Sequence, residues 1–589
     1  MRPTPWRRDC RHRPAGRRAS LCRAYRMTGH SLPPRVATVR PALVRRLGLA
    51  LIVGTLILGI ALPLVSLLHL ALQARDGSFV GLRNVLAFLG SPALAVSVWN
   101  SIWTALVTVI LTVPLAFGFA YALTRTCLRG RGLFNMIAAI PLLAPSVLPA
   151  IALIYLFGNQ GLLRPWLPEG FDIYGPWGII LAHCFYAFPL AVLILTTALS
   201  TADARLYEAA ASLGTPARRV FFTITLPGAR YGLVGAIFVV FTEVVTDFGV
   251  AKVIGGQFNV LATDVYKQVV GQQNFPMGAV IGFFLLLPAL LAFMVDRAVQ
   301  RKQQAQLTAR AVPLLPRPEA GRDRAALLYC LLIAAPILLV IGIAAWASLV
   351  SYWPYNLALT WRHYDFAETD PAGWGSVWNT VRLGLISACI GTPLVFGTAF
   401  LLDRAKDMPR LADAGRALML VPLAVPGLVM GLGYIFFFNA PWNPLNVLYG
   451  TMAILVLNSV MRLLPVTYVT ATTALTAIDR EFDAVGASLK VPGWKTFFRV
   501  TVPLCLPSLL NIWIYFFTNA ATTLSAIIFL YVADTKTASI AIVNMDEAGA
   551  TASAAAMGMV IAALCATAKL TQVGASALID RRRRRWSQR

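Results

Sequence analysis

Charged residues are scarce in this chain of 589 residues: Asp, Glu, Lys and Arg make up 13% of it, whereas hydrophobic residues make up 58%. This composition excludes an ordinary soluble protein. Uncharged apolar runs such as residues 47–72 reach the roughly 20 residues that cross a bilayer as a helix. Barrel strands would show only about ten alternating residues each, so the runs predict a bundle of membrane-spanning helices.

Nucleotide-binding and metal-binding motifs are also missing. The chain has no G-x-x-x-x-G-K-[ST] phosphate loop, so we expect it to have no ATPase site of its own. Its eight cysteines form no C-x-x-C pair, and its five histidines lack metal-ligand spacing. We therefore predict no catalytic residue, no metal site, no disulfide framework and no cofactor bound by this chain. His183 lies within an apolar run and is expected to be a hydrogen-bonded packing residue, with a functional role as the alternative.

Twelve apolar segments have about the length of a membrane-spanning helix, six in each half of the chain. They are residues 47–72, 98–123, 134–157, 177–199, 231–251, 276–296, 325–348, 377–402, 418–438, 449–473, 505–531 and 553–575. We expect each to cross the membrane as a helix, which gives an all-α polytopic membrane protein.

The net charge of +26 reflects membrane orientation rather than nucleic-acid binding. With a cytoplasmic N-terminus, only seven of the 51 basic residues fall in outside loops. These are Arg75, Arg83, Arg164, Lys252, Lys267, Arg362 and Lys536. The positive-inside rule predicts this asymmetry, so both termini are expected in the cytoplasm. Residues 1–46 hold 13 Arg and are expected to form a disordered tail near anionic lipid, with Met27 as an alternative start.

The two halves of the chain repeat each other. SVWNS at Ser97–Ser101 recurs as SVWNT at Ser376–Thr380, an offset of 279 residues. SLGTPARRVFFTITLP at residues 212–227 recurs as SLKVPGWKTFFRVTVP at residues 488–503, an offset of 276. Because each half holds six expected spans, the two copies have the same orientation in the membrane. We therefore expect an approximate two-fold axis along the membrane normal, with cargo passing close to it.

These features divide the chain into five segments. They are a basic cytoplasmic tail at 1–46, a first repeat at 47–296, a cytoplasmic linker at 297–324, a second repeat at 325–575 and a basic cytoplasmic tail at 576–589. The linker is charged and contains three prolines, which favours a joint between the repeats rather than a folded domain.

The most specific motif lies between the fourth and fifth spans, in YEAAASLGTPARRVFFTITLP. It contains Glu208, Ala209, Ala210 and Gly214. Alanines allow close approach of two helices, Glu208 can pair with a basic groove, and Gly214 permits a left-handed exit from a helix. The segment resembles the EAA loop of bacterial ABC importer permeases, in which it forms a short coupling helix that docks on a cytosolic ATPase subunit. An amphipathic loop without a partner is the alternative.

The resemblance implies a type I ABC importer permease fold, with about twelve transmembrane helices arranged as two parallel six-helix repeats. It implies two cytosolic ABC ATPase subunits, which hydrolyse ATP in place of this chain, and a periplasmic substrate-binding protein. It also implies the inner membrane of a bacterial cell, contact with membrane lipid and no nucleic-acid partner.

The second copy of the motif, FDAVGASLKVPGWKTFFRVTVP, departs from this pattern. In an ungapped alignment Ala484 takes the place of Glu208, and Lys490 takes the place of the glycine. Asp483, one position earlier, is expected to supply the acid. We therefore expect a second coupling helix that includes Asp483, Ala484, Ser488 and Lys490.

Polar residues in two corresponding spans are candidates for the pore lining. Glu243 and Asp247 are four residues apart and share one helical face. Asn519 and Thr523 take their places in the second repeat. Ionisable groups in a bilayer cost several kcal/mol unless they face a cavity or a partner. We expect a polar lining near the axis, with Arg462 as a counter-ion, whereas hydrogen bonds between helices are the alternative.

The cargo is predicted from resemblance alone. Residues 246–280, 425–438, 487–509 and 529–549 look like the 2-aminoethylphosphonate permease group. Iron(III) importer permeases share the layout of two fused halves. The resemblance therefore predicts 2-aminoethylphosphonate or another phosphonate, with iron(III) as the alternative. A proton-coupled secondary transporter is a further alternative, although it would need no coupling loops.

Overall fold

The computed structural model describes residues 39–306, 314, 316–405, 407–479, 481–489 and 491–587. Residues 1–48 and 49–589 form two separate units. Most of the predicted N-terminal tail, including Met27, lies outside the described residues, as does Lys490. Helix α1 (Val39–Leu56) already begins within the segment that we expected to be a tail.

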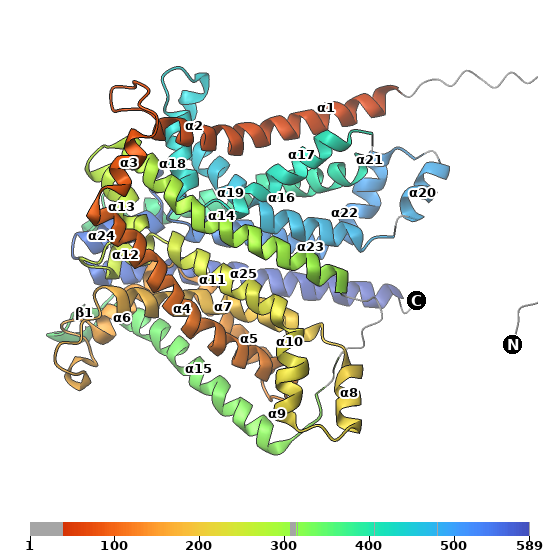
Figure 1. Ribbon diagram of the computed structural model, residues 1–589, viewed down its shortest axis with the longest axis horizontal. Coiled ribbons are helices and arrows are strands. Elements are labelled where there is room, and N and C mark those ends of the chain that lie inside the picture. Colours follow the sequence, from red (N-terminus) through yellow and green to blue (C-terminus); the bar gives the residue numbers. More distant parts are fainter. Residues whose placement is uncertain are drawn as a thin grey trace, which may run out of the picture. The chain divides into compact units, whose positions relative to one another are not determined.

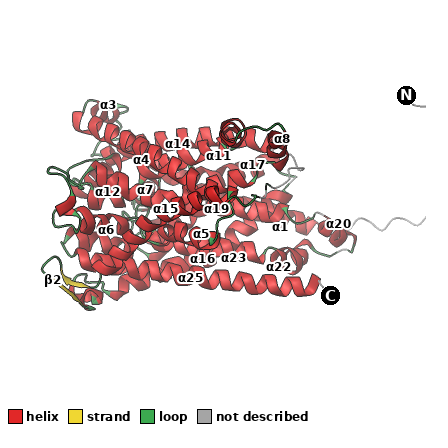
Figure 2. Ribbon diagram, turned by 90° about the horizontal axis from the view of Figure 1, so that it is seen from below, coloured by secondary structure: helices red, strands yellow, loops and turns green. Residues whose placement is uncertain are grey.

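Eight helices in the described part of the chain are long and apolar enough to cross a membrane (Figure 1). They are Arg46–Ala71 (most of α1, then η1, Ile57–Ala61, and α2, Leu62–Ala71), α4 (Pro92–Arg125), α7 (Pro176–Ser200), α14 (Phe275–Gln306), α15 (Ala320–Ala347), α16 (Trp374–Arg404), α19 (Met452–Thr476) and α25 (Thr551–Ser587). Helices make up nearly all of the regular structure (Figure 2). The predicted all-α polytopic architecture is therefore confirmed.

Four further candidate spans each consist of two helical segments that meet at a bend. They are Arg131–Leu143 (α5, η2) with α6 (Val147–Phe157), bent by 99°; Ala217–Gly228 (α9, η4, α10) with α11 (Arg230–Thr246), by 62°; Pro409–Leu423 (α17, η8) with α18 (Gly427–Phe438), by 114°; and Gly493–Leu504 (α21, η10, α22) with α23 (Leu506–Thr522), by 77°. With each pair taken as one span, the candidate spans number twelve, as the sequence predicts.

Two of the bends correct the expected single spans at 134–157 and 418–438. The chain reads PLLAP in the first bend and PLAVP in the second, so each bend contains two prolines. Proline lacks a backbone donor and disfavours helical geometry at the preceding residue, which interrupts the helix. The apolar run is continuous across each bend, so hydrophobicity alone does not reveal the break.

The internal repeat extends to the ends of the helices. Helices α11 and α23 begin and end 276 residues apart, and so do α7 and α19. Their internal prolines, Pro189 and Pro465, also correspond. The π-helical turns η4 (Phe221–Thr225) and η10 (Phe497–Thr501) occupy equivalent positions before α11 and α23. The repeated sequence therefore encodes repeated local structure.

The first span of each half packs against the other half. Helix α2 lies along α18 of the second half (Figure 1), and the Tyr434 hydroxyl donates a hydrogen bond to the Gly59 carbonyl oxygen over 2.7 Å. Helix α15 lies beside α4, α5 and α6 of the first half, and the Tyr329 hydroxyl donates to the Leu115 carbonyl oxygen over 2.9 Å. The two halves are therefore interlocked through their first spans.

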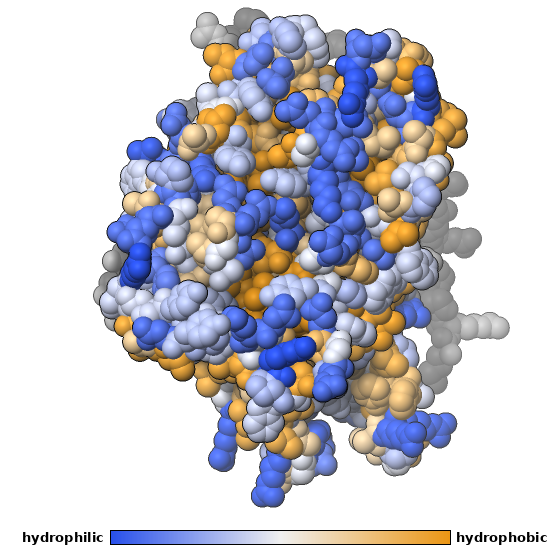
Figure 3. All heavy atoms as spheres, turned by 90° about the vertical axis from the view of Figure 1, so that its left-hand side faces the viewer, coloured by the Kyte–Doolittle hydropathy of each residue, from blue (hydrophilic) through white to orange (hydrophobic). Residues whose placement is uncertain are grey.

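Short elements gather at two opposite ends of the bundle (Figure 1). One end carries α8 (Ala204–Ser212) and α20 (Glu481–Ser488), and we call it the α8–α20 end. The other carries α3 (Arg83–Leu89), α12 (Gly249–Ile254), α13 (Leu261–Tyr266), α24 (Ala538–Glu547) and the antiparallel hairpin of β1 (Val350–Tyr352) and β2 (Asn356–Leu359). We call this second end the hairpin end. Hydrophilic side chains cover much of its surface, with apolar atoms visible between them (Figure 3).

The predicted linker and C-terminal tail are more helical than expected. Helix α14 continues to Gln306 and α15 begins at Ala320, so helix occupies both ends of the 297–324 linker. Helix α25 continues to Ser587, through the segment expected to be a tail from residue 576. Arg, Lys, Gln and Ala are good helix formers, and basic residues suit a helix C-terminus. Charged residues therefore end the membrane-spanning part of these helices, whereas the helices themselves continue.

Candidate functional site

The first predicted coupling loop folds as helix α8. The Asp203 carboxylate caps its N-terminus by accepting a hydrogen bond from the backbone N–H two residues later, over 3.1 Å. Glu208 and Ala209 are exposed, whereas Ala210 is buried. Gly214 follows the helix with a φ of 64°, the left-handed conformation that the sequence predicted. No atom outside the local backbone lies within 4 Å of the place a Cβ would take there, so backbone geometry alone favours glycine.

The second predicted coupling loop contains helix α20, at the same end of the bundle (Figure 1). Phe482 lines a small cavity together with Arg404 at the end of α16 and Thr501 at the end of η10. The Asp479 carboxylate accepts a hydrogen bond from the backbone N–H two residues later over 3.0 Å, as Asp203 does 276 residues earlier. The start of α20 therefore keeps the register of the ungapped alignment, in which Ala484 takes the place of Glu208.

The predicted pore residues lie at the ends of two corresponding helices. Glu243 lies in the last turn of α11 and Asp247 follows as its C-cap. Asn519 and Thr523 have the same positions on α23. Asn519 donates a hydrogen bond to the backbone of its own helix. The second half therefore presents hydrogen-bonding groups where the first half presents carboxylates.

Asp247 is paired within its own half. One of its carboxylate oxygens, Oδ2, lies 3.6 Å from His183 Nε2 and accepts a hydrogen bond from the Val250 N–H over 2.8 Å. The other ring nitrogen, Nδ1, lies 2.8 Å from the Ile179 carbonyl oxygen. A carbonyl oxygen can only accept a hydrogen bond, so Nδ1 must be the donor and carries a proton. An attractive contact with Asp247 requires a second proton, on either Nε2 or the carboxyl group.

This arrangement fits the expectation that His183 is a hydrogen-bonded packing residue, and it adds the Asp247 carboxylate as a neighbour. The side chain is fully buried, and Nε2 has no hydrogen-bond partner other than this near approach of Asp247. The signal in the sequence was a histidine within an apolar run, where buried polar groups are costly. Nothing local indicated that its partner would be the C-cap of α11.

Arg462 on α19 joins the polar residues of the two halves. Its Nη1 donates a hydrogen bond to the Thr523 hydroxyl over 2.9 Å. It also lies within electrostatic range of Glu243, and its role as a counter-ion stays a prediction. A Cβ on Gly427 would lie 3.0 Å from Arg462 Nε, so glycine there makes room for the guanidinium. We call Glu243, Asp247, His183, Arg462 and Thr523 the polar centre.

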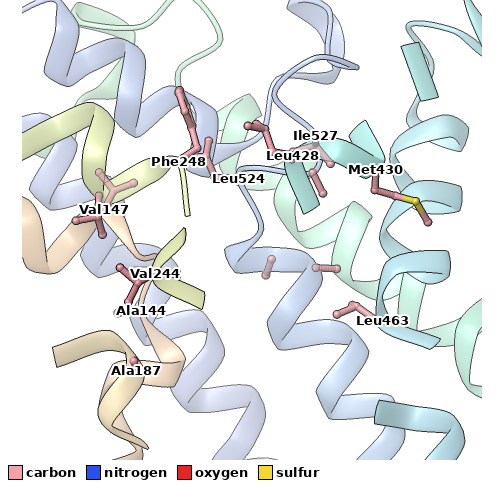
Figure 4. Close-up of a cluster of buried hydrophobic side chains, with 14 of the residues drawn as sticks. Ala144, Val147, Ala187, Val244, Phe248, Leu428, Met430, Leu463, Leu524 and Ile527 are labelled. Carbon is pink, nitrogen blue, oxygen red and sulfur yellow. The ribbon is translucent and has the colours of Figure 1, made fainter. Parts of the chain in front are cut away.

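Apolar side chains of both halves meet next to the polar centre (Figure 4). Phe248 directly follows Asp247, and Leu524 directly follows Thr523. Phe248 and Leu524 are both buried, and they lie next to each other. A Cβ on Gly249 would lie 3.0 Å from Leu524 Cδ2 and from Val147 Cγ2. The two halves are therefore in van der Waals contact at this level.

A cavity of about 730 Å³ lies at the hairpin end. Residues from both halves line it, among them Tyr155, Tyr174, Trp353, Arg362, Glu368 and Thr551. In the described part of the chain, no group of three or more His, Cys, Asp or Glu side chains could hold a metal ion. The polar centre has therefore no preformed set of metal ligands in this arrangement.

Comparisons with known proteins identify the family. The profile described as binding-protein-dependent transport system inner membrane component matches residues 113–304 and 395–584, one copy in each half. A ferric transport system permease of Actinobacillus pleuropneumoniae is 29% identical over 468 residues, which cover 76% of this chain and 66% of that protein. A thiamine transport system permease of Brucella abortus is 25% identical over 381 residues, 63% of this chain and 66% of that protein.

A molybdenum transport system permease of Haemophilus influenzae is 27% identical over 195 residues, 32% of this chain and 85% of that protein. This chain spans about two thirds of the length of the ferric and thiamine relatives. The names of these relatives do not support the predicted phosphonate cargo. With a family profile matched in each half, the chain belongs to the inner-membrane components of binding-protein-dependent transport systems.

Proposed function

We propose that this chain forms the complete translocation path of an ABC importer for ferric iron. The observation that carries the general proposal is the presence of one family copy in each half, with α8 and α20 at the same end of the bundle. The cargo follows from the ferric permeases, which are 29% identical over 76% and 71% of this chain. Iron(III), the alternative from the sequence, is therefore favoured over phosphonate.

The α8–α20 end faces the cytoplasm in this proposal. Exposed Arg205, Arg218 and Arg219 on and after α8 support this orientation through the positive-inside rule. Each short helix receives one ATPase subunit, and a periplasmic binding protein delivers cargo at the hairpin end. A mass measurement of the purified complex should find one copy of this chain with two ATPase subunits. Two copies of the chain with two ATPase subunits would contradict the proposal.

The polar centre gives this path its chemistry. Glu243 and Asp247 offer carboxylate oxygens, which suit a hard cation. Arg462 supplies a positive charge within electrostatic range of Glu243 in the other half. Phe248 and Leu524 bring the halves into contact here, so cargo passes only when α11 and α23 separate. Movement of α8 and α20, driven by the ATPase subunits, supplies that separation.

A phosphonate is the second candidate cargo. Residues 246–280 and 529–549 resemble the 2-aminoethylphosphonate group, and the guanidinium of Arg462 suits an anionic oxygen. The two cargoes make opposite predictions for the polar centre. Asp247→Asn should impair transport of a cation more strongly, whereas Arg462→Gln should impair transport of a phosphonate more strongly.

Uptake in proteoliposomes tests the cargo. The chain is reconstituted with the ATPase subunit and the binding protein that this proposal gives it as partners, and radioactive ferric citrate or 2-aminoethylphosphonate is offered. ATP-dependent uptake of iron alone, lost in Asp247→Asn, supports the proposal. Uptake of the phosphonate alone overturns the iron assignment. Uptake driven by a proton gradient without ATP would identify a secondary transporter instead.

A second experiment tests the coupling role of α8. Glu208→Lys reverses the exposed charge, and Gly214→Asp places a side chain on a left-handed backbone. Both should abolish uptake and cargo-stimulated ATP hydrolysis while the subunit remains inserted and abundant. Glu169→Lys, an exposed acid outside this loop, is the matched control and should transport normally. Normal transport by both α8 variants would show that this loop is not the coupling element.

A further inference from the structure

A second cavity at the hairpin end, of about 410 Å³, lies where α2, α14 and α18 meet (Figure 1). These helices belong to candidate membrane spans that end or begin at Ala71, Phe275 and Phe438. The cavity therefore lies at the level of a membrane surface. We call it the α2 groove, and its lining includes His69, Gln73, Phe275, Phe436, Asn439 and Trp442.

One face of α2 changes from apolar to polar as it reaches this groove. Leu62, Val65 and His69 are spaced three or four residues apart, which places them on one side of the helix. Leu62 and Val65 are exposed, so in a membrane-spanning chain they face lipid. His69 lines the groove itself, together with Gln73 just beyond the end of α2. A ligand that lies along this face is apolar at one end and polar at the other.

The polar end of the groove offers hydrogen bonds without net charge. The side-chain amide nitrogen of Gln73 lies 3.1 Å from His69 Nε2 and donates to it, so the other ring nitrogen, Nδ1, carries the proton and can donate to an oxygen. Asn439 adds an exposed amide. In the described part of the chain, no Asp, Glu, Lys or Arg lines the groove. Pockets for anionic headgroups are basic, so this lining suits a headgroup that balances its own phosphate charge.

Aromatic rings provide a place for the positive charge of such a headgroup. Phe275 and Phe436 meet edge to face with ring centres 6.0 Å apart, and the exposed Trp442 lines the same groove. An ammonium group over an aromatic face is attracted to it, most strongly over Trp. In the larger cavity, Thr551 and Tyr155 take the places of the two phenylalanines at the corresponding helix ends, and their hydroxyls share a hydrogen bond of 3.4 Å. The aromatic pair is therefore particular to the α2 groove.

We propose that the α2 groove binds one phospholipid with a zwitterionic headgroup. Its ammonium lies against Phe436 and Trp442, its phosphate accepts a hydrogen bond from His69, and its acyl chains follow Leu62 and Val65. The bound lipid contacts α2 and α14 of the first half and α18 of the second half, so it joins the two halves. The proposal requires a membrane-spanning chain, but it depends neither on the ATPase partners nor on the cargo proposed above.

Native mass spectrometry of the full-length chain in detergent, titrated with phosphatidylethanolamine or phosphatidylglycerol of the same acyl chains, tests the headgroup. The wild type should bind one phosphatidylethanolamine about fivefold more tightly, because only that headgroup carries an ammonium. Trp442→Ala should remove most of this preference. Trp166→Ala is the matched control, because Trp166 is exposed after α6 as Trp442 is after α18 and lines neither cavity. Equal affinity for the two lipids, or the same loss in both variants, would overturn the proposal.

Photocrosslinking locates the lipid without a substitution. A phosphatidylethanolamine with a diazirine near the glycerol end of one acyl chain is placed in nanodiscs with the wild-type chain. Crosslinked peptides should be enriched in α2 and in residues 439–442, relative to residues 158–166 of the corresponding connection in the first half. Equal labelling of the two connections would indicate an ordinary lipid layer around the protein and overturn the proposal.

Thermal unfolding tests whether the lipid joins the halves. Nanodiscs that contain phosphatidylethanolamine should raise the unfolding midpoint of the wild type by about 2 °C over phosphatidylglycerol alone, for a site filled at about 100 times its dissociation constant. Trp442→Ala should lose this shift, and Trp166→Ala should keep it. A wild-type midpoint that is the same in both lipids would show that the lipid does not hold the halves together.

Discussion

His183 and Asp247 show that a polar pair in this bundle depends on two helices at once. The positions of Glu243 and Asp247 on one face follow from helical periodicity, a property of a single segment. The partner of Asp247 comes from α7, in the preceding span, and Arg462, which lies within electrostatic range of Glu243, comes from the other half of the chain. A single residue in a span can therefore be recognised as polar and costly from sequence, but its partner depends on packing.

Gly214 allows a prediction at the residue scale. Gly214→Ala should destabilise the end of α8 by about 1 kcal/mol, because a Cβ on a left-handed backbone is strained while the surrounding space is open. Uptake normalised to the amount of permease should fall several-fold. Gly228→Ala is the control, because that position has open space and no positive φ. Equal uptake by the two variants would contradict a role for this backbone geometry.

Helices in this protein are positioned by small residues that face a larger side chain. A Cβ on Gly118 of α4 would lie 2.7 Å from the Tyr329 hydroxyl oxygen of α15. Gly397, its counterpart in the second repeat by the offset of 279, has no atom within 4 Å of such a Cβ. The same sequence position is therefore a helix contact in one half and open in the other.

This difference gives a prediction at the element scale. Gly118→Leu should destabilise the packing of α15 on α4 by about 1–3 kcal/mol through overpacking. Gly397→Leu, with the same change in size and polarity, should leave stability nearly unchanged. The midpoint of thermal unfolding in nanodiscs measures both. Equal losses would mean that α15 does not approach α4 as closely as the structure shows.

A second element-scale prediction concerns α24 and α12 at the hairpin end. Lys252 of α12 lies 2.6 Å from Glu547 of α24, which joins the two halves. Burial, and next the charge of Glu547, raise the pKa of Asp546 from its ordinary 3.8 to about 6, while Lys252 partly offsets the rise. Tyr155 and Tyr174 are also within electrostatic range of Asp546.

The raised pKa of Asp546 determines how the free energy of unfolding changes with pH. The folded state holds the Asp546 proton more tightly than the unfolded state, so stability is highest when the group is protonated. The free energy of unfolding should fall by up to about 3 kcal/mol as the pH rises from about 4 to 6. Asp546→Asn should remove this part of the pH dependence, measured as unfolding midpoints between pH 4 and 7. The exposed Asp534→Asn is the control, and a loss of the same size in both variants would contradict the assignment.

The whole described molecule is interlocked because each half contributes its first span to the other. Co-expressed fragments of residues 1–310 and 311–589 should therefore assemble and purify together through a tag on one of them. Gly433→Leu should weaken this association, because a Cβ there would lie only 2.8 Å from the Pro63 carbonyl oxygen of α2. Gly397→Leu is the control with open space around it. Fragments that do not purify together would contradict the exchange of first spans.

Much of this protein follows from its sequence alone. Composition and run length predicted the membrane-spanning helices, the nearly constant offset predicted the repeat, and the motif around Glu208 predicted a short helix ending at Gly214. Each of these depends on the properties of a single segment: how much apolar surface it carries, how many residues a bilayer requires, and which backbone angles glycine can adopt.

Only the tertiary structure decided which segments meet. The bends at PLLAP and PLAVP, the contact of His183 with Asp247 and the exchange of first spans were not predicted. Apart from the bends, each depends on contacts between side chains that are distant in the chain. The prolines mark where each helix is interrupted, but hydrophobicity does not reveal the break, and the angle of each bend depends on how the two parts of the apolar run pack on their neighbours. Hydrophobicity places a helix in the membrane, but in a bundle where almost every surface is apolar it does not select the partner.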